Sequence, residues 1–258
     1  MKDTTLYNKE RHQKILELIR QNGSVNVVSL AERFHVTTAT IRADLSLLES
    51  AGALTRTHGG AITKIYDRIE PKIHERHNKD EKKKIASEAV KLIKENDILL
   101  LDTGTTIVSL AKALVASNLT QLTIFSNDID VIRILEEKEQ FSLHLLPGKI
   151  RNGFHYCHGS LTSQMLYNCH FNKLFLSTSS ISIEEGLTTQ NPELAQLKRI
   201  MINTADEIIL LSDSSKLHHV DFQKFASLEQ IDTLIMDSDL SIEDSDRLKN
   251  SVKNLILV

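Results

Sequence analysis

Short apolar runs that alternate with helical patterns over residues 81–258 constrain the fold of this chain more than any other feature. Residues 98–101 read Ile-Leu-Leu-Leu, a continuous apolar run typical of a parallel strand covered on both faces. The alternation predicts a Rossmann-like α/β domain, with a parallel sheet between two layers of helices. The expected strands are residues 98–101, 122–125, 141–145, 174–176, 208–211, 233–236 and 255–258. The expected helices between them are residues 108–116, 129–135, 194–203 and 242–249.

A polar turn follows the first of these strands. It consists of Asp102, Thr103, Gly104, Thr105 and Thr106, and a helix comes next. Glycine lets the backbone approach a ligand closely, hydroxyl groups donate hydrogen bonds, and the start of a helix presents unpaired N–H groups. This combination favours a phosphate group at the end of the strand.

A second polar turn follows the strand at residues 208–211. It contains Asp213, Ser215 and Lys216, so it supplies an acid, a hydroxyl group and a cation. Lys216 can neutralise a phosphate, and Asp213 can orient a hydroxyl group or the turn itself. Ligands of such sheets bind at the carboxyl ends of strands. Two such turns on one sheet therefore indicate a site for a small anionic ligand.

The first fifty residues contain three helical patterns of another kind. Helices are expected at residues 9–21, 27–34 and 37–50, with Val28, Leu30, Ala31 and Phe34 facing inward on the second one. On the third helix, apolar residues recur at 41, 45 and 48, and the opposite face is polar. Thr37 can cap that helix. Two short helices, a turn and an amphipathic third helix predict a helix-turn-helix, which reads DNA with the start of its last helix.

A short hairpin is expected after the third helix. Residues 53–57 and 61–64 flank His58-Gly59-Gly60, whose glycines suit a tight tip. The hairpin would form a wing beside the DNA backbone or minor groove. The residues expected to contact double-stranded DNA are Thr37, Thr38, Thr40, Arg42, Arg56 and His58. The same pattern also fits a three-helix scaffold that binds a protein.

Charge is divided unevenly between the two parts. Residues 1–64 contain nine Lys or Arg and six Asp or Glu, a net charge of +3, whereas the rest of the chain has a net charge of −6. A basic head on an acidic body is expected when only the head meets phosphates.

The segment between the two parts is polar and contains Pro71, which predicts a linker at residues 65–80. We thus expect a winged helix-turn-helix at residues 1–64 and an α/β domain at residues 81–258. Asn78 and Glu81 have the spacing of a capping box for the first helix of that domain. Lys82 and the two lysines after it are interpreted as a solvated helix face.

Composition narrows the class further. No apolar stretch reaches the ~20 residues that cross a bilayer, and the polar start is not that of a signal peptide. Two cysteines do not make a disulfide framework, so we expect a cytoplasmic protein that does not associate with membranes. The His and Cys residues between 155 and 170 are irregularly spaced, and no metal or other cofactor is expected.

The run Val36-Thr37-Thr38-Ala39-Thr40-Ile41-Arg42-Ala43-Asp44-Leu45, followed by His58-Gly59-Gly60-Ala61, resembles the signature of the DeoR family of bacterial regulators. The Asp-x-Gly-Thr-Thr and Asp-Ser-Ser-Lys turns resemble those of the family's sensor domain, which is similar in fold to sugar-phosphate isomerases. The resemblance implies a repressor of sugar or polyol metabolism genes that responds to a phosphorylated sugar. It also adds Asn127 and Lys198 to the effector residues. Ala43 departs from the family pattern, which has a second Arg there.

The alternative function is a sugar-phosphate isomerase with an added nucleic-acid-binding head. Asp102, Asp213 and Lys216 could supply its acid-base groups. The head and the absence of a recognisable isomerase loop favour a regulator without enzymatic activity. Because one small head makes few base contacts, we also expect a homodimer or a larger even-numbered oligomer on paired half-sites.

Overall fold

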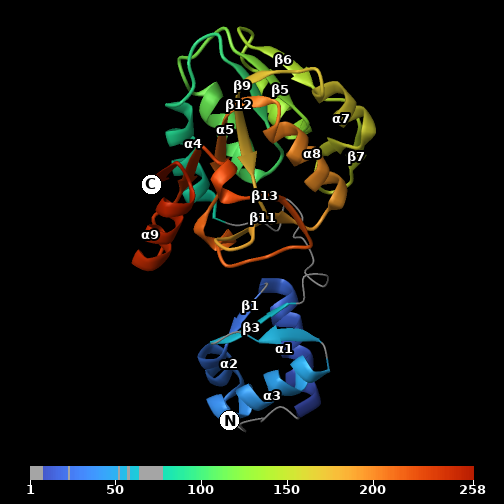
Figure 1. Ribbon diagram of the computed structural model, residues 1–258, viewed down its shortest axis with the longest axis vertical. Coiled ribbons are helices and arrows are strands. Elements are labelled where there is room, and N and C mark those ends of the chain that lie inside the picture. Colours follow the sequence, from blue (N-terminus) through green and yellow to red (C-terminus); the bar gives the residue numbers. More distant parts are fainter. Residues whose placement is uncertain (1–7, 23, 52, 57–58, 64–77) are drawn as a thin grey trace. The chain divides into compact units, whose positions relative to one another are not determined.

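The computed structural model describes residues 8–22, 24–51, 53–56, 59–63 and 78–258. The chain divides into two compact units, residues 1–70 and 71–258, and each is described by itself (Figure 1). Most of the predicted linker lies outside the described residues. Within it, Lys79 and Asp80 already belong to the first helix of the second unit.

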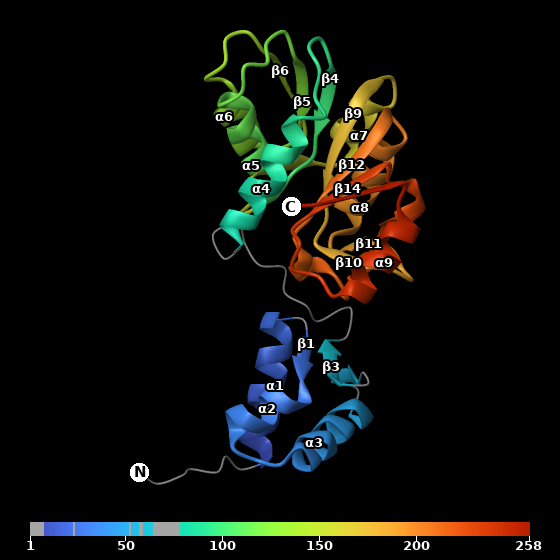
Figure 2. The same ribbon diagram turned by 90° about the vertical axis from the view of Figure 1, so that its left-hand side faces the viewer.

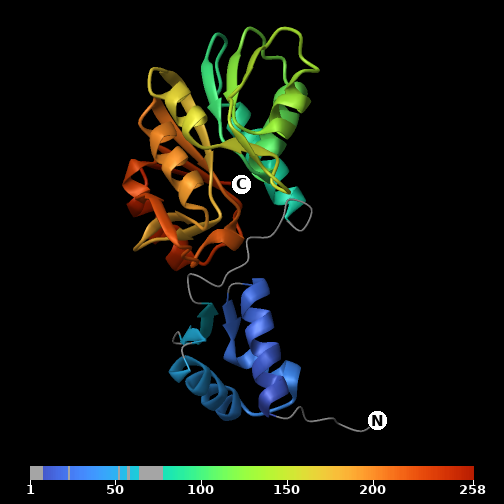
Figure 3. The same cartoon turned by 90° about the vertical axis from the view of Figure 1, so that its right-hand side faces the viewer.

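The described part of the first unit contains three helices and a small antiparallel sheet (Figure 3). The helices are α1 (Asn8–Asn22), α2 (Val27–Phe34) and α3 (Thr38–Ser50). The sheet has the order β1-β3-β2, formed by β1 (Ser24–Asn26), β3 (Gly60–Thr63) and β2 (Leu54–Arg56). The three predicted helices and the hairpin are present, and β1 is an additional strand that the sequence pattern did not predict.

Local side chains define where two of these helices begin. Asn26 caps α2 by accepting a hydrogen bond from the amide of Val28 at 2.8 Å. Thr37 caps α3 by accepting one from the amide of Thr40 at 3.1 Å. Val28 was expected to face inward, but its side chain is 55% exposed and Val27 is buried instead. With Val27, the buried positions of α2 are 27, 30, 31 and 34, a regular helical stripe.

The second unit is built on a seven-stranded parallel sheet (Figures 1 and 2). The strands are β4 (Ile98–Leu101), β5 (Thr123–Ser126), β6 (Ser142–Leu145), β9 (Phe171–Ser177), β12 (Ala205–Leu211), β14 (Thr233–Met236) and β15 (Asn254–Leu257). Their order is β15-β14-β12-β9-β4-β5-β6, and all neighbours are parallel. The chain proceeds outward in one direction from β4 and in the other from β9. In folds of this kind, ligands bind outside the carboxyl ends of the strands at such a change of direction.

Helices cover both faces of this sheet, as predicted (Figure 2). They are α4 (Lys79–Val90), α5 (Thr105–Val115), α6 (Ile129–Leu135), α7 (Ser160–Leu166), α8 (Pro192–Ile202) and α9 (Ile242–Ser251). On β9, Leu174 and Leu176 pack into the core with α8, whereas Phe175 packs into the core with α4 and α5. Alternate residues of one apolar run therefore serve two cores. No described helix is both long enough and apolar enough to cross a bilayer.

The structure also contains short elements that the sequence pattern did not predict. A hairpin pairs β7 (Lys149–Arg151) with β8 (Tyr156–His158). A second antiparallel sheet contains β10 (Ser180–Ser182), β11 (Gly186–Thr189) and β13 (Gln223–Ala226). These strands are three or four residues long and rich in Ser and Thr, so they lack the apolar pattern that marks a core strand.

Candidate functional site

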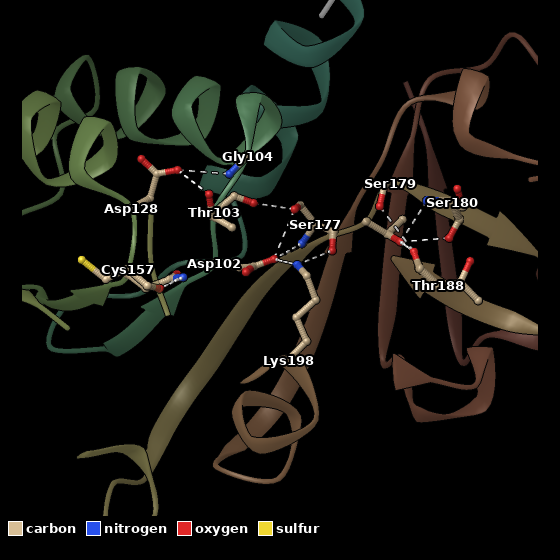
Figure 4. Close-up of polar contacts among 12 residues, drawn as sticks. Asp102, Thr103, Gly104, Asp128, Cys157, Ser177, Ser179, Ser180, Thr188 and Lys198 are labelled. Atoms are coloured by element: carbon tan, nitrogen blue, oxygen red, sulfur yellow. Dashed lines mark hydrogen bonds and ion pairs between the residues drawn. The ribbon is translucent and has the colours of Figure 1, made fainter. Parts of the chain in front are cut away.

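Asp102 is the central group at the carboxyl edge of the sheet (Figure 4). It follows β4 and is fully buried. Its Oδ2 atom accepts hydrogen bonds from the amide of Ser177 at 2.9 Å, from the Ser177 hydroxyl at 3.2 Å and from the ammonium of Lys198. Lys198, on α8, also donates to the carbonyl of Ser177 at 3.0 Å. Asp102 and Lys198, two separately predicted effector residues, are thus brought together at the end of β9.

The other oxygen of Asp102 is different. Oδ1 is buried and accepts no hydrogen bond from the described residues. Asn127, which follows β5, shows the same asymmetry, because its amide group donates to the carbonyl of Cys157 at 3.0 Å and its Oδ1 atom is buried with no described donor. Buried acceptors without donors are rare and costly. Two of them after neighbouring strands provide acceptors for a ligand that carries hydroxyl groups.

The turn after Asp102 is organised by a residue that the sequence did not single out. Asp128 caps α6, and its Oδ2 atom accepts hydrogen bonds from the Thr103 hydroxyl at 2.7 Å and the Gly104 amide at 3.2 Å. Gly104 has φ 132°, a conformation that favours glycine. Two donors of the predicted phosphate cradle are therefore already bound to Asp128. Thr105 and Thr106 begin α5 just beyond them.

Burial raises the pKa of Asp128 above its ordinary value, although hydrogen bonds from Thr103, Val131 and Gly104 oppose the shift. The carboxyl end of β5 therefore holds a carboxyl group that is disfavoured in its charged form. An additional negative charge placed beside Asp128 would raise this pKa further.

The second predicted turn, after β12, is centred on Asp213. Its Oδ1 atom accepts hydrogen bonds from the side chain of Asn78 at 2.8 Å and from the Ser215 hydroxyl. Burial by itself would raise the pKa of Asp213, but Lys216, Ser215, Lys82 and Asn78 together lower it below its ordinary value. Asp213 is thus held as a carboxylate, although its Oδ2 atom, near Lys82, is buried and accepts no hydrogen bond from the described residues.

Two interpretations of α4 are corrected by this turn. Lys82 is not solvated: it is 4% exposed, and its Nζ atom lies 3.7 Å from Oδ2 of Asp213. Asn78 does not cap α4 through its side chain, which is turned toward Asp213 instead. Both errors arise because the partner lies more than 130 residues later in the sequence.

In the first unit, the predicted DNA-contacting residues lie at the start of α3 and on the hairpin. Arg42 is exposed on α3, and Thr38 and Thr40 are half-buried. Arg56, on β2, donates from its guanidinium to the Ser46 hydroxyl at 2.8 Å, and Ser46 donates to the carbonyl of Arg42 at 2.9 Å. The hairpin therefore presents Arg56 to the outer face of α3. His58 lies outside the described residues.

A buried ion pair joins α1 to α3 on the inner side of this unit. Arg11 donates to both oxygens of Asp44, from Nε at 2.6 Å and from Nη2 at 2.9 Å, and Nε2 of His12 lies 2.8 Å from Oδ1 of Asp44. Burial acts to raise the pKa of Asp44, but Arg11 and His12 together lower it below its ordinary value. This cluster fixes the orientation of α3.

Comparisons with known proteins agree with the two units. Residues 11–64 match the family described as the DeoR-like helix-turn-helix domain, and residues 77–238 match the DeoR C terminal sensor domain. A lactose phosphotransferase system repressor of Streptococcus mutans is 36% identical, with 95% of this chain and 96% of that protein covered. A putative aga operon transcriptional repressor of Escherichia coli O157:H7 is 32% identical, with 96% and 93% covered.

Among solved structures, a D-ribose-5-phosphate isomerase in complex with phospho-erythronic acid matches with a TM-score of 0.40 and 18% identity, over 55% of each chain.

Proposed function

This chain belongs to the DeoR family of transcriptional regulators, and from that premise we propose that it is a repressor of sugar-metabolism genes controlled by a phosphorylated sugar. Both parts of the family's architecture are present, the helix-turn-helix and the sensor domain. Relatives that span nearly the whole chain are named as repressors of a lactose phosphotransferase system and of an aga operon. These names favour a regulator over the isomerase alternative.

The first unit would bind double-stranded operator DNA. We propose that the start of α3 enters the major groove, where Thr37, Thr38, Thr40 and Arg42 lie close to base edges and phosphates. Arg56 and His58 would extend the contact from the wing. A protein that acts on chromosomal operators works in the cytoplasm.

The second unit would bind the sugar phosphate along the carboxyl edge of its sheet. One observation carries this proposal: Asp102 and Asn127 each bury an acceptor atom that no described residue satisfies. Sugar hydroxyl groups supply the missing donors. The turn of Ser215 and Lys216 follows β12, two strands from β4, and strands lie about 4.8 Å apart. A ligand about 10 Å long would thus reach Lys216 with its phosphate. Thr105, Thr106, Asp213 and Lys198 would complete the site.

A thermal-shift screen tests this assignment. Ribose 5-phosphate, glucose 6-phosphate, fructose 6-phosphate, glycerol 3-phosphate, inorganic phosphate and the unphosphorylated sugars are each added to the full chain. A ligand at a hundredfold excess over its dissociation constant stabilises the folded state by ~2.7 kcal/mol. We expect a phosphorylated sugar to raise the melting temperature and its unphosphorylated form to have little effect. Stabilisation by inorganic phosphate alone would contradict a role for the hydroxyl groups.

We also propose that the chain acts as a homodimer or a larger even-numbered oligomer, because a pair of heads can occupy two half-sites about 34 Å apart, or a multiple of that spacing. Light scattering at micromolar concentration measures this directly. A monomer both with and without operator DNA would contradict the proposal.

A further inference from the structure

Asp213 is shared between two elements of the second unit that are distant in sequence. Ser215 and Lys216 act on it from its own turn, at the edge where the effector is proposed to bind. Asn78 and Lys82 act on it from the start of α4, through a hydrogen bond of 2.8 Å and an ion pair of 3.7 Å. One buried carboxylate therefore connects the turn to α4.

The start of α4 is built for this connection. Asn78 has φ 63°, a left-handed conformation, and its side chain makes no capping bond. Its amide points to Asp213 instead, and Lys82 lies one helical turn later on the same face. Lys82 is buried, whereas Lys83 and Lys84 are exposed. Of these three consecutive lysines, Lys82 pairs with Asp213. Among the described residues, α4 is the first helix of the second unit.

We propose that Asn78 and Lys82 transmit effector binding through Asp213 to the start of α4. The inference rests on the proposed function. A phosphate that binds Ser215 and Lys216 takes a hydroxyl donor and a cation away from Asp213. Asn78 and Lys82 are then the remaining partners of that carboxylate, so they hold it more strongly. Effector binding thereby holds the first turn of α4 more firmly against Asp213. A ligand can shift operator binding only through such a difference between two states.

The experiment compares Lys82→Met with Lys84→Met in the full chain. Lys84 is an exposed neighbour on the same helix, so its variant controls for the loss of one positive charge. The probe is the compound from the panel above that raises the wild-type melting temperature most. Operator DNA is selected from a random-sequence pool with the wild-type protein. Its affinity is measured for each protein with and without the probe, and the ratio of the two affinities is the response.

We expect the probe to weaken operator binding at least tenfold for wild type and Lys84→Met, and less than threefold for Lys82→Met. The melting temperature of Lys82→Met should still rise with the probe. This result would show that the variant binds the probe, but that binding no longer affects the affinity for the operator. Lys82→Arg retains the charge and should restore most of the response. Asn78→Ala provides a second variant, with a partly reduced response, in case Lys82→Met does not fold.

Hydrogen exchange gives a readout within α4 itself. In the wild type, the probe should slow exchange of the amides at residues 79–83 severalfold, and in Lys82→Met it should not. An equal response of Lys82→Met and wild type, or exchange at residues 79–83 that the probe leaves unchanged, would overturn the inference while leaving the proposed function intact. If no compound raises the wild-type melting temperature or changes operator binding, the proposed function and this inference both fail.

Discussion

Each unit of the protein contains a buried carboxylate paired with a buried cation, but the two pairs are completed differently. In the first unit, both oxygens of Asp44 are occupied, by Arg11 and His12. In the second unit, all donors of Asp102 converge on Oδ2, and Oδ1 accepts nothing from the described residues. Both carboxylate oxygens of the first pair accept hydrogen bonds, whereas one oxygen of the second pair accepts none from the described residues.

Under the proposed function, the difference separates a structural ion pair from a group that binds the effector. A buried acceptor without a donor costs about 1–3 kcal/mol, so a fold that needs the carboxylate only for stability gains by satisfying it. Asp44 follows that rule and fixes α3 against α1. Asp102 does not, and under the proposed function a hydroxyl group of the ligand would remove the deficit. The completeness of a buried pair thus indicates its role.

The largest effect is expected when the first pair is broken. Asp44→Asn removes the charge that balances buried Arg11, and breaking a buried pair from one side costs about 3–5 kcal/mol. Calorimetry of the full chain should show a lower melting temperature for the transition that operator DNA raises. Glu32→Gln, an exposed acid on α2, is the control and should leave that transition unchanged. A stable Asp44→Asn variant would remove the distinction between the two pairs.

The next largest effect is expected on effector binding, at the carboxyl edge of the sheet. Lys216→Ala removes the cation expected to contact the phosphate, and a hydrogen bond to a charged group contributes about 1.5–3 kcal/mol. Titration calorimetry should therefore show effector binding weakened by about 10- to 150-fold. The operator would then stay bound at effector concentrations that release the wild type, if the effector causes release. Lys112→Ala, an exposed lysine of α5, serves as the control. Equal ligand responses in wild type and Lys216→Ala would show that this turn is not the phosphate site.

A comparable or smaller effect is expected on the outer face of α3. Arg42→Ala should cost about 1–3 kcal/mol of operator affinity if Arg42 contacts a base, or lower the salt dependence by about one unit if it contacts a phosphate. Fluorescence anisotropy at several salt concentrations distinguishes the two contacts. Lys94→Ala changes the same charge in the second unit and should alter neither quantity. If Arg42→Ala matches the wild type in both, α3 does not present this residue to DNA.

The smallest effect is the response of the first unit to acid. The pKa of Asp44 is lowered in the folded state, so its pair stabilises the fold above the ordinary carboxyl pKa, and this contribution is lost as the pH falls through the lowered value. The operator-sensitive transition of the wild type should therefore move to lower temperature below about pH 4. Asp44→Asn cannot titrate at this position and should show a flatter profile. Parallel profiles in the two proteins would exclude Asp44 as the cause.

The sequence predicted the architecture well because the architecture depends on local periodicity. The apolar run at residues 98–101 and the helical stripe at 41, 45 and 48 are each visible within a few residues. The site was harder to predict. Ser177 was missed because the strand appeared to end at residue 176, and Lys173 interrupts the apolar pattern before it. Lys173 is buried, and its Nζ atom lies 2.7 Å from the carboxylate of Asp97, in the loop before β4.

The same limit explains why Lys82 was interpreted as solvated. Three consecutive lysines are equivalent in sequence, and only the folded sheet brings Asp213 to one of them. Asp128 was missed although it adjoins Asn127, because its role depends on Thr103 and Gly104 at the end of another strand. Residues that act through partners on other strands have no local signature. Most of the predicted effector residues lie in turns, whose chemistry is local.

The position of β9 beside β4 determines the order in which this chain can fold as it is synthesised. β4, β5 and β6 are translated first, but one edge of β4 stays unpaired until β9 emerges some seventy residues later. Long-range parallel pairing forms slowly, and an open strand edge invites association with other chains. The described strands of the first unit lie within residues 24–63. A nascent chain therefore completes the strands of its helix-turn-helix unit before the second unit can close its sheet, and a chain truncated before residue 171 keeps an open edge.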